Sequence, residues 1–174
     1  YVLLVVAFYF LAGPQLHFRE SRGNLTMPPG DASTVELVEG VTVEQFFSAP
    51  IQRLESISTR WCAYNPVNAG TLTVELARVS DGEVLLKQQF DTSTLTDNQV
   101  LTVVSEKPIE TAYNVPLVVR MYSDAQPGSA GSPIRCTTAG AEGFALVIDG
   151  NPAEGMLCFD ARGTDHIWIG LHYW

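Results

Sequence analysis

The chain has 174 residues, and its 19 acidic against 10 basic residues give a net charge of −9. This balance argues against a nucleic-acid-binding protein, which needs clustered Lys and Arg, and against a domain that lies flat on an anionic membrane. Because 46% of the residues are hydrophobic, the chain has enough apolar side chains for a buried core, and disorder is not expected.

The first segment, residues 1–12, is uncharged and ends at Gly13-Pro14. A complete transmembrane helix needs about 20 apolar residues. The chain does not begin with Met, so residues 1–14 are expected to be the remainder of a truncated transmembrane helix, with Tyr9 and Phe10 at the membrane interface. A signal peptide is the first alternative, although Phe10 stands where its cleavage site needs a small residue. A buried element of a soluble fold is the second.

Residues 15–34 are expected to form a linker, because glycine and proline interrupt them and no hydrophobic periodicity runs through them. From residue 35 the pattern changes to short runs rich in β-branched and aromatic residues. Residues 35–174 are therefore expected to form one domain, of ordinary size.

Alternating polar and apolar residues predict a series of short strands in this domain. In chain order they are residues 41–47, 54–64, 71–78, 84–90, 100–104, 113–122, 144–148, 155–159 and 166–173. Asp81-Gly82 predicts a hairpin turn between the third and fourth strands. Residues 92–98 are expected to form a loop or one helical turn, and residues 125–133 a loop. Pro116 places its strand at a sheet edge or makes it begin after the proline.

About eight or nine strands with no helix after the first segment predict an all-β protein, an antiparallel β-sandwich. A jelly roll is the preferred topology. An immunoglobulin-like sandwich is the alternative, although the Cys…Trp…Cys arrangement of that fold is missing.

The three cysteines do not form a CxxC pair, so no zinc site is expected. Cys136 and Cys158 flank a hairpin-like segment and are the pair best placed for a disulfide. Three buried, reduced cysteines, with Cys62 as the third, are the leading alternative.

Asp160, Asp165 and His166 occur close together, and their carboxylates are weak candidates for holding a cation. A polar turn between two strands is the preferred interpretation, so no metal site and no cofactor are expected. Motifs for zinc peptidases, serine hydrolases and phosphate-binding loops are missing from the sequence. Paired carboxylates for glycoside hydrolysis remain open, with Glu44 and Glu75 among several candidates on solvated strand faces.

Aromatic rings can instead stack on sugars. Trp61 lies mid-strand among apolar neighbours and is expected in the core. Tyr64 borders a turn and Tyr113 a strand start, so these two are the candidate ligand-binding residues.

Several runs of the sequence resemble a known group of domains. They are Phe46-Phe47, Leu54-Glu-Ser-Ile57, Ala63-Tyr64-Asn65, residues 68–76 and residues 90–98. They are similar to extracytoplasmic β-sandwich domains of bacterial polytopic membrane proteins linked to cell-surface polysaccharide synthesis, which look like carbohydrate-binding jelly rolls. The resemblance covers residues 41–122 and implies location and fold, but it transfers no catalytic residue.

The sequence therefore predicts a noncatalytic binding or assembly module on the extracytoplasmic side of a bacterial cell membrane. Its expected partners are the membrane, through residues 1–14, and a glycan or neighbouring domains of the same membrane protein. The alternative is a carbohydrate-processing enzyme that uses paired carboxylates.

Overall fold

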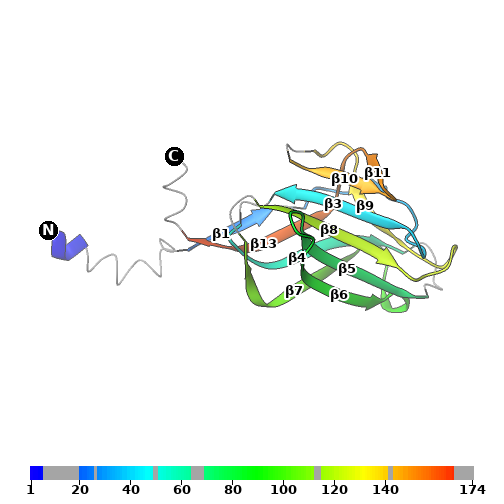
Figure 1. Ribbon diagram of the computed structural model, residues 1–174, viewed down its shortest axis with the longest axis horizontal. Helices are drawn as coiled ribbons and strands as arrows, with labels where there is room; N and C mark the ends of the chain where they lie inside the picture. The colour runs from blue at the N-terminus through cyan, green and yellow to red at the C-terminus, as the bar shows by residue number, and fades with distance from the viewer. Residues whose placement is uncertain are drawn as a thin grey trace.

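The computed structural model describes residues 1–5, 20–25, 27–48, 51–63, 69–111, 115–140 and 143–166. These residues form two antiparallel β-sheets that pack face to face, with one short 3₁₀ helix (Figure 1). The predicted all-β sandwich is confirmed.

The first sheet is built around β4 (Arg53–Cys62). Its strand order is β1 (Glu20–Leu25), β13 (Phe159–His166), β4, β9 (Ser132–Cys136) and β12 (Met156–Leu157). Two further strands join it from the side, β7 (Gln99–Glu110) beside β4 and β2 (Ala32–Ser33) beside β9.

The second sheet has β3 and β8 at its centre. Its order is β11 (Asn151–Ala153), β10 (Ala145–Ile148), β3 (Thr42–Ser48), β8 (Pro116–Ser123), β5 (Thr71–Arg78) and β6 (Val84–Asp91). The 3₁₀ helix η1 (Thr92–Thr94) follows β6 and leads toward β7 in the other sheet, which confirms the predicted helical turn.

The core lies between the sheets because side chains alternate along each strand, and one face of each sheet is apolar. In β4 the side chains of Ile57, Thr59 and Trp61 share the inner face and are at most 2% exposed. Across the core, Phe47 of β3 meets Phe159 of β13 edge to face, with ring centroids 5.0 Å apart. Such aromatic pairs stabilise a core beyond the area that they bury.

One buried polar side chain connects the two sheets. Gln45 of β3 is fully buried, and its Oε1 accepts a hydrogen bond of 2.8 Å from the backbone N–H of Leu157 in β12. Its Nε2 donates to the carbonyl of Ala145 in β10 at 3.2 Å. The side chain therefore satisfies backbone groups on both sides of the sandwich, and burial without such partners would be costly.

Two local predictions depend on special backbone residues. Gly82 has a φ of 72°, the left-handed conformation that the predicted hairpin between β5 and β6 requires. Pro116 is the first residue of β8, so this strand begins at the proline. The alternative of an edge strand is wrong, because β8 lies between β3 and β5.

Other predictions need correction. The predicted linker contains β1 and β2, and β1 pairs with β13 along all six of its residues. The segment 159–166 is not a polar turn but β13, a strand between β1 and β4. Its polar side chains misled the interpretation, because Asp160 and Arg162 lie on the outer face while Phe159 and Ala161 fill the core. β9 begins at the end of the predicted loop 125–133 and was not predicted.

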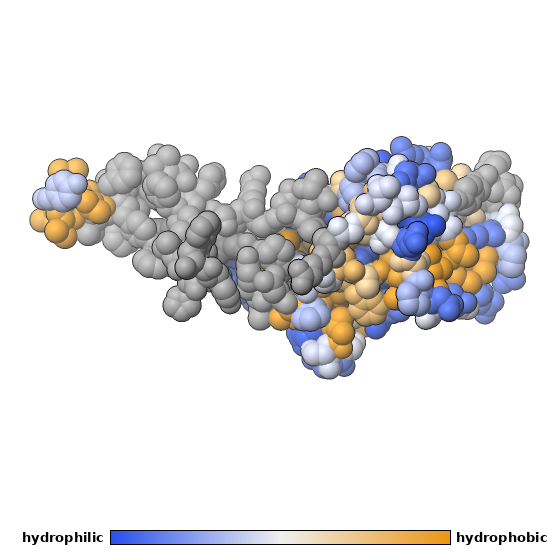
Figure 2. All heavy atoms as spheres, turned by 90° about the horizontal axis from the view of Figure 1, so that it is seen from above, coloured by the Kyte–Doolittle hydropathy of each residue, from blue (hydrophilic) through white to orange (hydrophobic). Residues whose placement is uncertain are grey.

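The apolar N-terminal segment lies mostly outside the described residues. Tyr1 to Val5 are exposed and form one helical turn, the hydrophobic cluster at the left end of Figure 2. Among the described residues, no helix is both long and apolar enough to cross a membrane.

Candidate functional site

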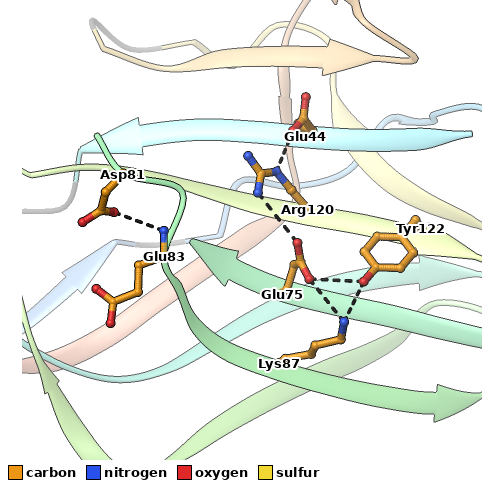
Figure 3. Close-up of polar contacts among 7 residues, drawn as sticks. All are labelled: Glu44, Glu75, Asp81, Glu83, Lys87, Arg120 and Tyr122. Atoms are coloured by element: carbon orange, nitrogen blue, oxygen red, sulfur yellow. Dashed lines mark hydrogen bonds and ion pairs between the residues drawn. The ribbon is translucent and has the colours of Figure 1, made fainter. Parts of the chain in front are cut away.

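The candidate site is a row of charged side chains on the outer face of the second sheet (Figure 3). Because side chains alternate, Val43 and Gln45 of β3 point into the core and Glu44 points outward. The strand register places Glu44 opposite Arg120 of β8, which lies opposite Glu75 of β5. Lys87 of β6 ends the row opposite Glu75. We call these four residues the charged row.

Charge alternates along the charged row, and each member contacts the next. Arg120 Nε lies 2.8 Å from Glu44 Oε1, and its second contact, Nη1 to Glu75 Oε1, is 3.8 Å long. Lys87 Nζ lies 3.6 Å from Glu75 Oε2. Two cations and two carboxylates balance, so the charged row itself carries no net charge.

Tyr122 of β8 lies beside the charged row, two residues along the strand from Arg120. Its hydroxyl donates to Glu75 Oε2 at 3.2 Å and accepts from Lys87 Nζ at 2.9 Å. The hydrogen bond with Tyr122 is the largest cause that raises the pKa of Lys87, and Glu75 adds to it. The phenol ring is thus held in one orientation between Thr42 of β3 and Thr73 of β5, its register partners.

Exposure differs along the charged row. The Glu75 side chain is 10% exposed, those of Glu44 and Arg120 are 23% and 31% exposed, and that of Lys87 is 50% exposed. The charged row is therefore most exposed to solvent at Lys87 on β6 and least exposed at Glu75 on β5. A partner that approaches over Lys87 and Tyr122 meets hydrogen-bond donors, acceptors and an aromatic ring together.

The same geometry does not resemble a pair of catalytic carboxylates. Glycoside hydrolysis needs two carboxyl groups that face each other across the substrate, one of them free to give up a proton. Here Arg120 lies between Glu44 and Glu75 and contacts both.

The two aromatic residues predicted to bind a ligand, Tyr64 and Tyr113, lie outside the described residues. Trp61 is 0% exposed and belongs to the core, as expected. The sequence singled out neither Tyr122 nor its pairing with the charged row. Alternation along each strand was enough to place Glu44, Glu75 and Tyr122 on outer faces, but the strand order that unites them is not readable from local patterns.

Of the two candidate cation ligands, only Asp160 has a described side chain. Asp160 Oδ2 accepts a hydrogen bond of 2.9 Å from Arg162, and the side chain is 9% exposed. Its Oδ1 is buried and has no hydrogen-bond partner among the described residues. The side chain of Asp165 lies outside the described residues. Within the described ranges no group of three or more His, Cys, Asp and Glu residues is placed to hold a metal.

Cys136 and Cys158 are not bridged to each other. Both are buried: Cys136 ends β9 opposite Met156 of β12, and Cys158 lies between β12 and β13, where its N–H donates to the carbonyl of Ile134. Burial raises the pKa of the Cys158 thiol to about 11, while Arg60 acts in the opposite direction. This thiol is therefore protonated and unreactive at neutral pH.

Comparisons with known proteins do not identify the chain. No family model matches it, and no curated protein matches it. Among solved structures, a chain titled desmodium yellow mottle tymovirus is similar over 83% of this chain and 84% of that chain, with 9% sequence identity and a TM-score of 0.34.

Proposed function

We propose that the chain is a noncatalytic binding module on the extracytoplasmic side of a bacterial membrane protein, and that it binds glycan hydroxyl groups on the outer face of the second sheet. The single observation that carries the binding proposal is the Tyr122 ring, fixed by Glu75 and Lys87 beside the charged row. Sugars are bound by such combinations, because aromatic rings contact their C–H faces while polar groups fix their hydroxyls.

We also propose a jelly-roll topology for the sandwich. The eight longest strands are, in chain order, β1, β3, β4, β5, β6, β7, β8 and β13. Numbered one to eight, they form the orders one-eight-three-six in the first sheet and two-seven-four-five in the second. These orders are those of a jelly roll, in which strands are exchanged between two sheets through Greek-key connections.

The binding proposal predicts a specific role for the Tyr122 ring. Tyr122→Ala should weaken binding of a soluble cell-surface oligosaccharide by about tenfold or more, the equivalent of about 1.4 kcal/mol. Tyr122→Phe should keep most of the affinity because it keeps the ring. Isothermal titration of the intact chain with a panel of neutral and acidic oligosaccharides measures both effects.

Gln88→Ala, on an exposed part of β6, is the matched control and should bind like the parent chain. Urea unfolding of each variant checks that its fold is retained. Equal affinity for the parent and Tyr122→Ala would remove Tyr122 from the site. No binding by any variant would end the glycan proposal. Tyr64 and Tyr113 stay predictions, tested by their alanine variants in the same titrations.

The membrane proposal rests on the uncharged residues 1–12 and on the resemblance described above. We expect the intact chain to sediment with membranes and a variant lacking residues 1–14 to stay in the soluble fraction. If both remain soluble after cell fractionation, residues 1–14 are not an anchor.

A further inference from the structure

The edge of the first sheet at β7 lacks the features that block pairing between molecules. An exposed strand edge offers unpaired N–H and C=O groups to another chain, and proteins suppress this with charges, prolines or very short strands. Among the described strands, β7 pairs only with β4. Residues 99–105 of β7 contain no charge, proline or glycine.

The other edges in the described part of the chain are protected. Lys87 and Asp91 lie on β6, Glu20 and Arg22 on β1, and Pro152 on β11. The edge strands β2 and β12 have two residues each. The second half of β7 is also protected, by residues 106–108, which are Glu, Lys and Pro. The open stretch is therefore confined to residues 99–105.

The side chains of residues 99–105 also distinguish this stretch from the protected edges. Val100 and Val104 point outward and are 47% and 63% exposed, with exposed Thr102 between them. Leu101 and Val103 point into the core and are at most 2% exposed. Two exposed valines on an unpaired edge are the kind of apolar surface that a partner strand covers.

The sequence of the stretch is symmetric about Thr102. In the order Gln-Val-Leu-Thr-Val-Val-Ser, each polar residue has a polar counterpart and each apolar residue an apolar one at equal distance from the threonine. A two-fold interface needs this self-complementarity, because the same patch of both molecules meets itself. Antiparallel pairing permits a two-fold axis through a residue pair of either hydrogen-bonding class.

We propose that two copies of this chain associate by antiparallel pairing of β7 with β7, with the two-fold axis at Thr102. Val100 of each copy then lies opposite Val104 of the other, and Leu101 lies opposite Val103. The two first sheets become one continuous sheet, and the exposed valines cover each other.

The register follows from side-chain matching. In a continuous sheet, outward-facing residues of one strand pair with outward-facing residues of the next strand. The two-fold axis must therefore pass through a residue of β7 and not between two residues, so the nearest alternatives to Thr102 are Leu101 and Val103. Centred on Leu101, it places Val100 against Thr102 and Gln99 against Val103. Centred on Val103, it places Val104 against Thr102 and Val100 against Glu106. Only the axis at Thr102 pairs like with like, and threonine pairs are themselves favourable across strands.

The test uses the intact chain in a non-ionic detergent, which keeps residues 1–12 from associating. Sedimentation velocity over a concentration series should show a monomer–dimer equilibrium. Thr102→Lys and Thr102→Glu each place like charges opposite each other at the axis, so each should weaken the homodimer by about tenfold or more. An equimolar mixture of the two variants should restore dimers, because Lys then faces Glu.

Thr102 is exposed, so both variants should fold, and circular dichroism checks this. Gln88→Lys on the edge of β6 is the matched control and should dimerise like the parent chain. A parent chain that stays monomeric at all concentrations, or dimers that survive either Thr102 variant, would overturn the proposal. Homodimers that are lost in both variants and do not return on mixing would overturn the register. Loss of dimers in Gln88→Lys would indicate that the dimer interface includes β6, and would overturn the proposed pairing through β7.

Discussion

At the scale of single residues, burial controls the chemistry of the cysteines. Cys158 is fully buried, and its pKa is raised from an ordinary value of 9.0 to about 11, so its thiol stays protonated over the neutral range. Cys62 is only partly buried. We expect iodoacetamide to label Cys62 first in the native chain, and Cys136 and Cys158 only as it unfolds. Peptide mass spectrometry after timed labelling measures the order.

The raised pKa of Cys158 also predicts a pH dependence. The folded chain holds this proton more tightly than the unfolded chain does, so the contribution to stability is present below pH 9 and is lost as the pH rises to about 11. Urea midpoints should fall across that window, and the fall should be smaller in Cys158→Ser. Equal falls in the parent chain and the variant would assign the effect to other groups.

Single residues also show how far the sequence could be interpreted. Trp61 was correctly assigned to the core, because its neighbours Ile57 and Thr59 share its face of an alternating strand. Asp160 was assigned to a turn, because three polar residues within a few positions outweighed the alternation. Its neighbours Phe159 and Ala161 were the signal for a strand, and long-range pairing with β4 and β1 determines the outcome.

At the scale of elements, Gln45 is the contact between sheets that local patterns did not reveal. An inward glutamine on an otherwise apolar face is explained only once β10 and β12 are in place to bond it. Strands with strong alternation, such as β3 and β5, were predicted nearly to the residue. The short strands β2 and β12 carry too few residues for any periodicity to be recognised.

Replacing Gln45 by leucine should therefore destabilise the fold. The change removes the bond to the Ala145 carbonyl and leaves the buried Leu157 N–H without its side-chain partner, and a buried unsatisfied group costs about 1–3 kcal/mol. We expect a loss of about 1–3 kcal/mol in the free energy of unfolding, measured by urea titration. Gln88→Leu on the exposed part of β6 is the control, with an expected change within about 0.5 kcal/mol. A Gln45 variant as stable as that control would show that water replaces the side chain.

At the scale of the whole molecule, the sequence established the fold class but not the partners of the strands. Alternation identifies a strand and its buried face, whereas neighbours are chosen by contacts between distant segments. β1 and β13 come from opposite ends of the described chain, and both are rich in polar residues. The candidate site also depends on strand order, because its members come from four strands that only the completed sheet brings into one row.

The pairing of β1 with β13 predicts where the folded unit begins. A variant lacking residues 1–19 keeps β1, so its urea midpoint should match that of the intact chain. A variant lacking residues 1–26 loses the six-residue ladder and leaves β13 as an edge strand. Because each backbone hydrogen bond contributes about 0.5–1.5 kcal/mol, we expect a loss of a few kcal/mol and faster amide exchange along residues 159–166. Equal midpoints and unchanged exchange in both variants would show that the fold does not need β1. The folded unit would then begin after residue 26, in the segment that contains β2.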